Sequence, residues 1–148
     1  MQDSLGVVTV VVVGLMVGVE FAVAVFVNPI LDRLPDDATL AARSDGGRVL
    51  GRVMPVWYIC SVVLGGAWTA MAWGGAGASP AAAGTALLLV SVAMSLALLV
   101  PINSRAITWT PDSAPADWKE QAHRWDRYHY VRVAVIVLAF ALYAVALA

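Results

Sequence analysis

Charged residues are scarce in this chain, and cysteine is nearly absent. Only 13% of the 148 residues are charged, against about one quarter in soluble domains, while 61% are hydrophobic. The single cysteine, Cys60, excludes an internal disulfide. The net charge of −1 argues against nucleic acid as a partner. The sequence also lacks soluble-enzyme motifs such as a phosphate-binding loop, a dinucleotide-binding glycine fingerprint or HExxH.

Long apolar runs, by contrast, occur four times, at residues 5–27, 49–73, 81–102 and 129–147. Each run is long enough for a helix to cross about 30 Å of hydrocarbon. None shows the alternation of a barrel strand, and a helix satisfies its own backbone hydrogen bonds in lipid. The sequence therefore predicts an all-α fold, an integral membrane four-helix bundle that forms a single domain over residues 1–148 and lies in the lipid bilayer.

The basic residues are distributed asymmetrically along the chain. All nine Lys and Arg residues lie in or beside the segments 28–48 and 103–128, whereas the connection GGAGASPAAAG at 74–84 is uncharged. Basic loops remain on the cytoplasmic side of a membrane. We therefore expect a multi-pass protein of the cell membrane with two charged cytoplasmic loops and both termini outside.

One carboxylate, Glu20, interrupts the apolar sequence VGVEFAV of the first run. Ionisable groups inside a membrane are costly and commonly mark functional sites. Helical periodicity places Trp125, His129 and Arg132 in one stripe of the fourth run, which we expect to face the bundle interior. Arg132 and Arg52 are the candidate partners of Glu20. We favour a functional polar site over a purely structural ion pair that fixes helix register.

The polar residues at the ends of the four runs fall on one side of the membrane. Asn28 ends the first run and Asn103 follows the third, while His129 begins the fourth. Glu20 lies eight residues before Asn28, which is about 12 Å deeper along a helix. This arrangement predicts a pocket that opens toward the cytoplasm and has Glu20 at its floor.

Several short strings together resemble the anthrone oxygenase-like family of small integral membrane proteins. They are NPILDRLP, RVMPVW, VPINSRAITW and DWKEQAHRWDRYHYVRVAVIVLAF. The family pattern corresponds here to Asn28, Pro29, Pro55, Pro101, Asn103, Trp125, His129 and Arg132. The resemblance implies four membrane helices. It also implies oxidation of polyketide anthrones to anthraquinones by dioxygen without an evident cofactor.

This resemblance and the polar residues lead to one functional hypothesis, a membrane-embedded oxygenase of secondary metabolism. Its substrate would be a hydrophobic aromatic small molecule, and no cofactor besides dioxygen is expected. Such chemistry needs a base, a group that stabilises an oxyanion, and flat apolar surfaces. The candidate catalytic residues are Glu20, His129, Arg132, Asn103 and Arg52. The candidate substrate-binding residues are Trp125, Tyr58 and Asn28.

Three alternatives stay open at this stage, and a fourth is disfavoured. A metal-dependent membrane oxidase would bind its ion through His129, Glu20 and Asp126. A non-catalytic membrane partner or assembly subunit would use the charged loops. Homo-oligomers are a further possibility, since Gly14 and Gly18 form a small-residue pair typical of helix packing. A transporter is disfavoured because the third run up to Val100 and the outer halves of the first and fourth runs hold almost no polar residues.

Overall fold

Four long helices make up the protein. The computed structural model describes residues 2–148, and within that range it contains helices and turns and no strand. All four helices are long and apolar enough to cross a membrane. The predicted all-α membrane bundle is therefore confirmed.

The first two long helices form one hairpin. The first runs through α1 (Gln2–Ala22), a π-helical turn η1 (Val23–Val27) and α2 (Asn28–Leu31). A short connection then leads into α3 (Asp36–Met71), which returns along the bundle.

The last two long helices form a second hairpin. The third runs through α4 (Ala78–Met94), a π-helical turn η2 (Ser95–Leu99) and α5 (Val100–Ala106). A longer connection without regular structure precedes α6 (Trp118–Leu147).

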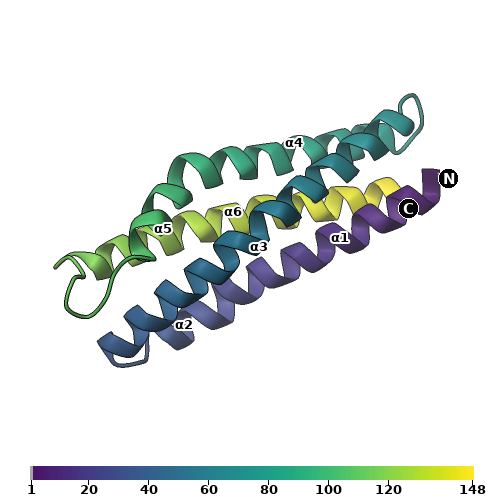
Figure 1. Ribbon diagram of the computed structural model, residues 1–148. Coiled ribbons are helices and arrows are strands. Elements are labelled where there is room, and N and C mark those ends of the chain that lie inside the picture. Colours follow the sequence, from purple (N-terminus) through teal and green to yellow (C-terminus); the bar gives the residue numbers. More distant parts are fainter. Residues whose placement is uncertain (1) are drawn as a thin grey trace.

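The four helices pack as a ring. In this ring α1 contacts α3, α3 contacts α4, α4 contacts α6, and α6 contacts α1. Figure 1 shows the N-terminal end of α1 and the C-terminal end of α6 together with the α3–α4 turn at one end of the bundle. The opposite end, formed by α2, α5 and the first turns of α3 and α6, is the charged end. The ring brings the two hairpins together along a common axis.

The helices extend further into the charged end than the apolar runs predict. α3 begins at Asp36 and α6 at Trp118, so the segments 28–48 and 103–128, predicted as loops, are largely helical. An ion pair of 2.7 Å between Lys119 of α6 and Asp36 of α3 joins the two extensions. Hydropathy identifies the part of a helix that contacts lipid and does not identify the residue at which the helix begins. The observed helices are therefore longer than the predicted apolar runs.

The π-helical turn η1 widens the first membrane helix just before Pro29. Pro29 has no N–H, and its ring would clash with an α-helical carbonyl four residues earlier. The N–H of Asn28 donates to the carbonyl of Val23 and not to that of Ala24. The hydroxyl of Tyr130, on α6, donates instead to the Ala24 carbonyl across 2.7 Å. The widened turn thus ties the first helix to the last.

An apolar layer fills the bundle between its middle and the end that holds the chain termini. The layer comprises fully buried side chains from three helices, Val13, Leu88, Ile136 and Ala139. Many large apolar side chains face outward, among them Leu15, Val56 and Leu138. Such an outer surface suits contact with lipid.

Beyond this layer, three hydroxyl side chains form a hydroxyl cluster, Thr69, Thr85 and Tyr143. The Tyr143 hydroxyl bonds Thr85 Oγ1 at 2.8 Å, and Thr69 Oγ1 lies 3.1 Å from Thr85 Oγ1. The Tyr143 ring stacks on Trp68 with centroids 5.7 Å apart. A Cβ at Gly65 would collide with the Tyr143 hydroxyl, which requires glycine there. This cluster lies in a region where the sequence predicts almost no polar groups.

Of the predicted small-residue pair Gly14 and Gly18, only Gly14 takes part in helix packing within residues 2–148. Gly14 packs against Phe140, whose ring would lie 2.9 Å from a Cβ at this position, whereas a Cβ at Gly18 would meet nothing within 4 Å. Gly14 therefore allows α1 and α6 to approach closely.

Candidate active site

A buried ion pair joins α1 to α6 near the middle of the bundle. Arg132 Nη2 donates to Glu20 Oε2 across 2.6 Å, and the two residues are 8% and 4% exposed. Each charge compensates for the other, whereas either alone would be strongly unfavourable at this depth. The sequence predicts two arginines as possible partners of Glu20, and the structure pairs the carboxylate with Arg132. Arg52 lies exposed on α3.

His129 links the backbone of Glu20 to the guanidinium of Arg132. Its Nε2 lies 3.2 Å from the Glu20 carbonyl oxygen, and its Nδ1 lies 3.0 Å from Arg132 Nη2. A carbonyl only accepts hydrogen bonds and a guanidinium only donates them. These partners assign the ring hydrogen to Nε2 and leave Nδ1 as the acceptor. His129 is therefore held as a neutral imidazole between its two partners.

Arg132 also contacts the other two helices of the ring. Its Nη1 donates to Ser95 Oγ across 2.9 Å. Its guanidinium carbon lies 5.4 Å from the centre of the Tyr58 ring, a cation–π distance. Ser95 opens η2, the π-helical turn that precedes Pro101. A guanidinium held from three directions in this way has one fixed orientation.

Five buried polar atoms around the ion pair have no hydrogen-bond partner among residues 2–148. These open polar atoms are Glu20 Oε1, Arg132 Nε, Tyr58 Oη, Ser91 Oγ and Trp125 Nε1. The Tyr58 hydroxyl lies beside the Glu20 carboxyl and Ser91 without hydrogen-bond geometry to either. An unsatisfied buried polar atom costs about 1–3 kcal/mol. Buried polar atoms without partners are rare in native proteins, so their concentration here sets this site apart from the rest of the bundle.

An aromatic pair lies beside this site on the side of the charged end. The Trp125 indole stacks on the His129 ring, with centroids 4.7 Å apart and planes 20° apart. Because Trp125 precedes His129 by one helical turn, it lies between the ion pair and the charged end. Trp125 is half-buried, so its flat indole is partly exposed where it stacks on the site.

Two other predicted site residues lie apart from the ion pair. Asn103 packs on α3 at the charged end, where its Oδ1 would lie 2.8 Å from a Cβ at Gly47. Asn28 donates from Nδ2 to Asp126 Oδ1 across 2.9 Å. Thus the structure groups Glu20 and Arg132 with His129, and places the two asparagines nearer the charged end.

The charged end holds a second polar network around Asp126. Arg43 donates to both Asp126 oxygens, at 3.1 and 2.9 Å, and to Asp32 Oδ1 at 2.8 Å. Asp126 and Asn28 are only 7% and 5% exposed. The network therefore joins α2, α3 and α6 through one guanidinium and two carboxylates.

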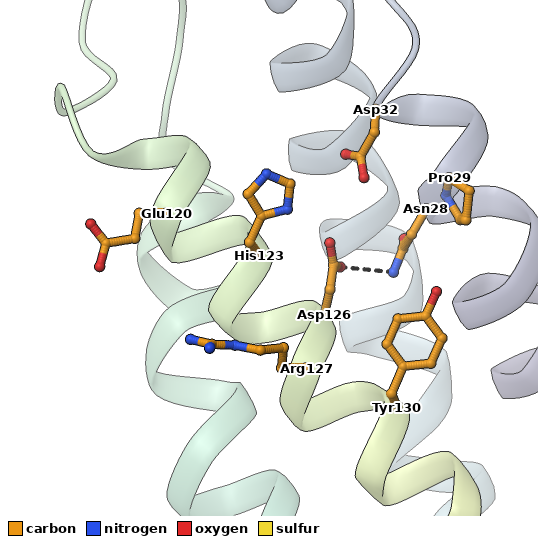
Figure 2. Close-up of a pocket in the computed structure, with 8 residues that line it drawn as sticks. All are labelled: Asn28, Pro29, Asp32, Glu120, His123, Asp126, Arg127 and Tyr130. Atoms are coloured by element: carbon orange, nitrogen blue, oxygen red, sulfur yellow. Dashed lines mark hydrogen bonds between the residues drawn. The ribbon is translucent and has the colours of Figure 1, made fainter.

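A pocket of about 570 Å³ opens beside this network, between α2 and α6. Its lining residues are Asn28, Pro29, Asp32, Glu120, His123, Asp126, Arg127 and Tyr130. Figure 2 shows that Asp32, in the turn after α2, and His123 and Asp126 of α6 point toward one another. Their potential ligand atoms lie within 4.8 Å of one another. This trio, and not the predicted combination of Glu20 and His129 with Asp126, is the group within residues 2–148 that has metal-ligand spacing.

Sequence reasoning missed several residues of both sites. Ser91 and Ser95 of the third helix carry no charge, so only helical phase relative to Arg132 could have suggested them. Asp32, Arg43 and His123 lie in the segments 28–48 and 103–128, which the sequence predicts as charged cytoplasmic loops, so nothing singles them out. The sequence does not show that these segments contain helices that pack against one another.

Fold and site together define a small multi-pass membrane protein with an ion pair and a histidine buried between its helices. The family model described as anthrone oxygenase matches residues 46–142, which is about two thirds of the chain. The chain therefore belongs to the anthrone oxygenase family, as its sequence strings indicate. No curated protein and no solved structure matches the chain. The matched residues include His129 and Arg132, whereas Glu20 lies outside them and is joined to the site by its contacts.

Proposed function

We propose that this protein is a membrane-embedded oxygenase that oxidises an aromatic, anthrone-type molecule of a polyketide pathway with dioxygen and without a resident metal or organic cofactor. One observation carries the proposal. Glu20 is a buried carboxylate with one oxygen bound to Arg132 and the other, Oε1, among the open polar atoms. Family membership supports the reaction class.

The chemistry requires a base and a group that stabilises negative charge. Glu20 Oε1 removes a proton from the methylene carbon between the aromatic rings, and the electrons delocalise onto the substrate's carbonyl oxygen. Arg132 Nε, Tyr58 Oη and Ser91 Oγ offer hydrogen-bond donors for that oxyanion. The resulting anion is electron-rich enough to reduce dioxygen directly.

The atoms and electrons of this reaction balance. The anion forms a carbon–oxygen bond with dioxygen, and protonation gives a hydroperoxide. Cleavage of the O–O bond with loss of the remaining C–H proton then releases water and leaves a carbonyl group. In total, a methylene group and dioxygen become a carbonyl group and water.

His129 and Trp125 act in support of this reaction. Because the Nδ1 lone pair of His129 already accepts a hydrogen bond from Arg132, we assign the base to Glu20 and a positioning role to His129. Trp125 offers its flat face to the aromatic rings. Flat apolar substrates partition into bilayers, which accounts for a reaction site placed between membrane helices.

The orientation of the protein belongs to the same proposal. The positive-inside rule supports a cytoplasmic charged end in the cell membrane, with both termini outside. The apolar layer of Val13, Leu88, Ile136 and Ala139 separates the ion pair from the hydroxyl cluster. A site closed by apolar side chains on one side favours an enzyme over a transport path.

Oxygen consumption by the purified protein in detergent, with an anthrone as substrate, tests the proposal. We expect uptake that is insensitive to a chelator and falls at least about 100-fold in Glu20→Gln. The matched control is Thr85→Val, which removes a buried hydroxyl of the hydroxyl cluster and leaves uptake close to wild type. Chelator-sensitive uptake would reassign the protein to the metal-dependent oxidases. Absence of uptake by folded wild-type protein with a series of anthrones would favour the non-catalytic partner.

A further inference from the structure

The pocket at the charged end gathers hydrogen-bond acceptors. Asn28 directs its Nδ2 to a carboxylate, which fixes its amide orientation and leaves Oδ1 as an acceptor with no partner in the described part of the chain. Asp32 uses Oδ1 for Arg43, and within residues 2–148 its Oδ2 has no hydrogen bond. His123 faces both carboxylates across the pocket (Figure 2). A ligand bound here meets several acceptors at once.

The charge of the pocket favours a neutral donor over a metal ion. Arg43 donates to both Asp32 and Asp126, so its guanidinium already neutralises part of their charge. A divalent metal ion would have to compete with this fixed cation for the same oxygens. A hydroxyl group needs only an open lone pair, which Asp32 Oδ2 and Asn28 Oδ1 provide. Anionic ligands are disfavoured by the carboxylates.

The walls of the pocket suit a flat ring system. Pro29 lines it from α2, and Tyr130 lines it from α6, two helical turns beyond His123. The pocket volume of about 570 Å³ lies within the range of small-molecule sites. Tyr130 also bonds the Ala24 carbonyl, one turn from Glu20 on the first helix. The pocket therefore lies on the same helix pair as the ion pair, about 12 Å from Glu20 along the axis.

We propose that the pocket at the charged end binds the phenolic hydroxyl groups of a neutral aromatic substrate through Asp32, His123 and Asn28, before the substrate reaches Glu20. This inference rests on the proposed function, because it names the feature by which that substrate is recognised. It assigns specificity to residues outside the reacting site. It also accounts for buried polar side chains at Asn28 and Asp126 that the reaction itself does not use.

A binding experiment that needs no turnover tests this proposal separately. The probes are a hydroxyanthraquinone whose hydroxyl lies away from its carbonyl groups and the methyl ether of the same compound. Their affinities are measured by equilibrium dialysis of the protein in detergent, corrected for partition into protein-free micelles. Because a hydrogen bond to a charged acceptor is lost, we expect the ether to bind wild type at least about tenfold more weakly.

Four variants distinguish the pocket from the reacting site. In Asp32→Asn and His123→Ala the preference for the hydroxyl compound should largely disappear. It should persist in Asp37→Asn, an exposed carboxylate in the first turn of α3 that does not line the pocket, and in Glu20→Gln. His123→Ala leaves the Arg43 network intact, so it tests the pocket even if Asp32→Asn disturbs folding.

Two results would overturn the inference. One is a preference that survives both pocket substitutions or that vanishes in Glu20→Gln, since the hydroxyl would then be recognised elsewhere. The other is calorimetric binding of Mn²⁺ or Zn²⁺ to wild type that is lost in His123→Ala, which would make the trio a metal site. Neither result depends on oxygen uptake, so failure here leaves the proposed reaction open to its own test.

Discussion

Two buried polar groups in the same bundle, the ion-pair site and the hydroxyl cluster, differ in how fully their hydrogen bonds are satisfied. Thr85 donates to the Ala81 carbonyl, Thr69 donates to the Gly65 carbonyl, and Tyr143 bonds Thr85. Around the ion pair, by contrast, five side-chain atoms are open. Glu20 and Arg132 are buried whereas Thr69 and Thr85 are half-buried, so the less buried region is the one whose hydrogen bonds are satisfied.

The difference indicates what each region is for. A satisfied network rigidifies a helix bundle, and each of its members is replaceable at the cost of a hydrogen bond. A network with open atoms is destabilising by itself, so its retention needs a reason beyond packing. The hydroxyl cluster links α3, α4 and α6, whereas in the proposed function a substrate supplies the partners that the ion-pair site lacks.

The largest expected effect on stability comes from breaking the ion pair. Arg132→Met leaves the Glu20 carboxylate buried and uncompensated, and we expect the free energy of unfolding to fall by about 3–5 kcal/mol. Chemical denaturation in detergent, followed by circular dichroism, measures this change.

The double variant Glu20→Gln with Arg132→Met is the control for that effect. Because no unpaired charge remains, it should recover most of the lost stability while oxygen uptake stays low. A single variant as stable as wild type would mean that Glu20 is hydrated or neutral, which would remove the contrast with the hydroxyl cluster.

A smaller effect is expected from overpacking the hydroxyl cluster. Gly65→Ala places a Cβ against the Tyr143 hydroxyl and should cost about 1–3 kcal/mol. Gly18→Ala is the matched control, since a Cβ there meets nothing within 4 Å. Thermal unfolding of both variants measures the difference.

Combining Gly65→Ala with Tyr143→Phe sharpens this result. Removal of the hydroxyl relieves the closest contact, so the two changes together should cost less than their sum. If the stability costs of the two substitutions simply add, the strain in Gly65→Ala does not come from the contact between its Cβ and the Tyr143 hydroxyl.

The sequence predicted the bundle and the ion-pair residues for the same physical reason. Lipid tolerates few ionisable groups, so Glu20 and Arg132 stand out against apolar neighbours and helical phase brings them inward. Asp32 and His123 lie in a polar segment where charge carries no such signal. Uncharged Ser91 is hidden for the opposite reason, because serine is common in membrane helices. Only the packing of the helices identifies these three residues.

The helix ends were predicted poorly for a related reason. The first turns of α3 and α6 are polar, and contacts such as Lys119 with Asp36 lie far apart in sequence. Hydropathy cannot report such contacts, whereas it reports the lipid-facing part of each helix directly. The pocket at the charged end is built from this part of the chain. Asn28, a predicted substrate-binding residue, lines this pocket, whereas Glu20, predicted as the pocket floor, does not.

The smallest effect is the sharpest comparison, because it sets two buried tyrosines against each other. Tyr143→Phe removes a hydroxyl bonded to Thr85 and should lower stability by about 0.5–1.5 kcal/mol with little effect on uptake. Tyr58→Phe removes one of the open polar atoms, so stability should stay level or rise while uptake falls. Denaturation and oxygen consumption on the same preparations measure both quantities. An equal loss of stability in the two variants would mean that the Tyr58 hydroxyl is bonded in the resting protein. The donor proposed for the substrate oxyanion would then already be occupied, and Arg132 Nε and Ser91 would have to stabilise that charge without it.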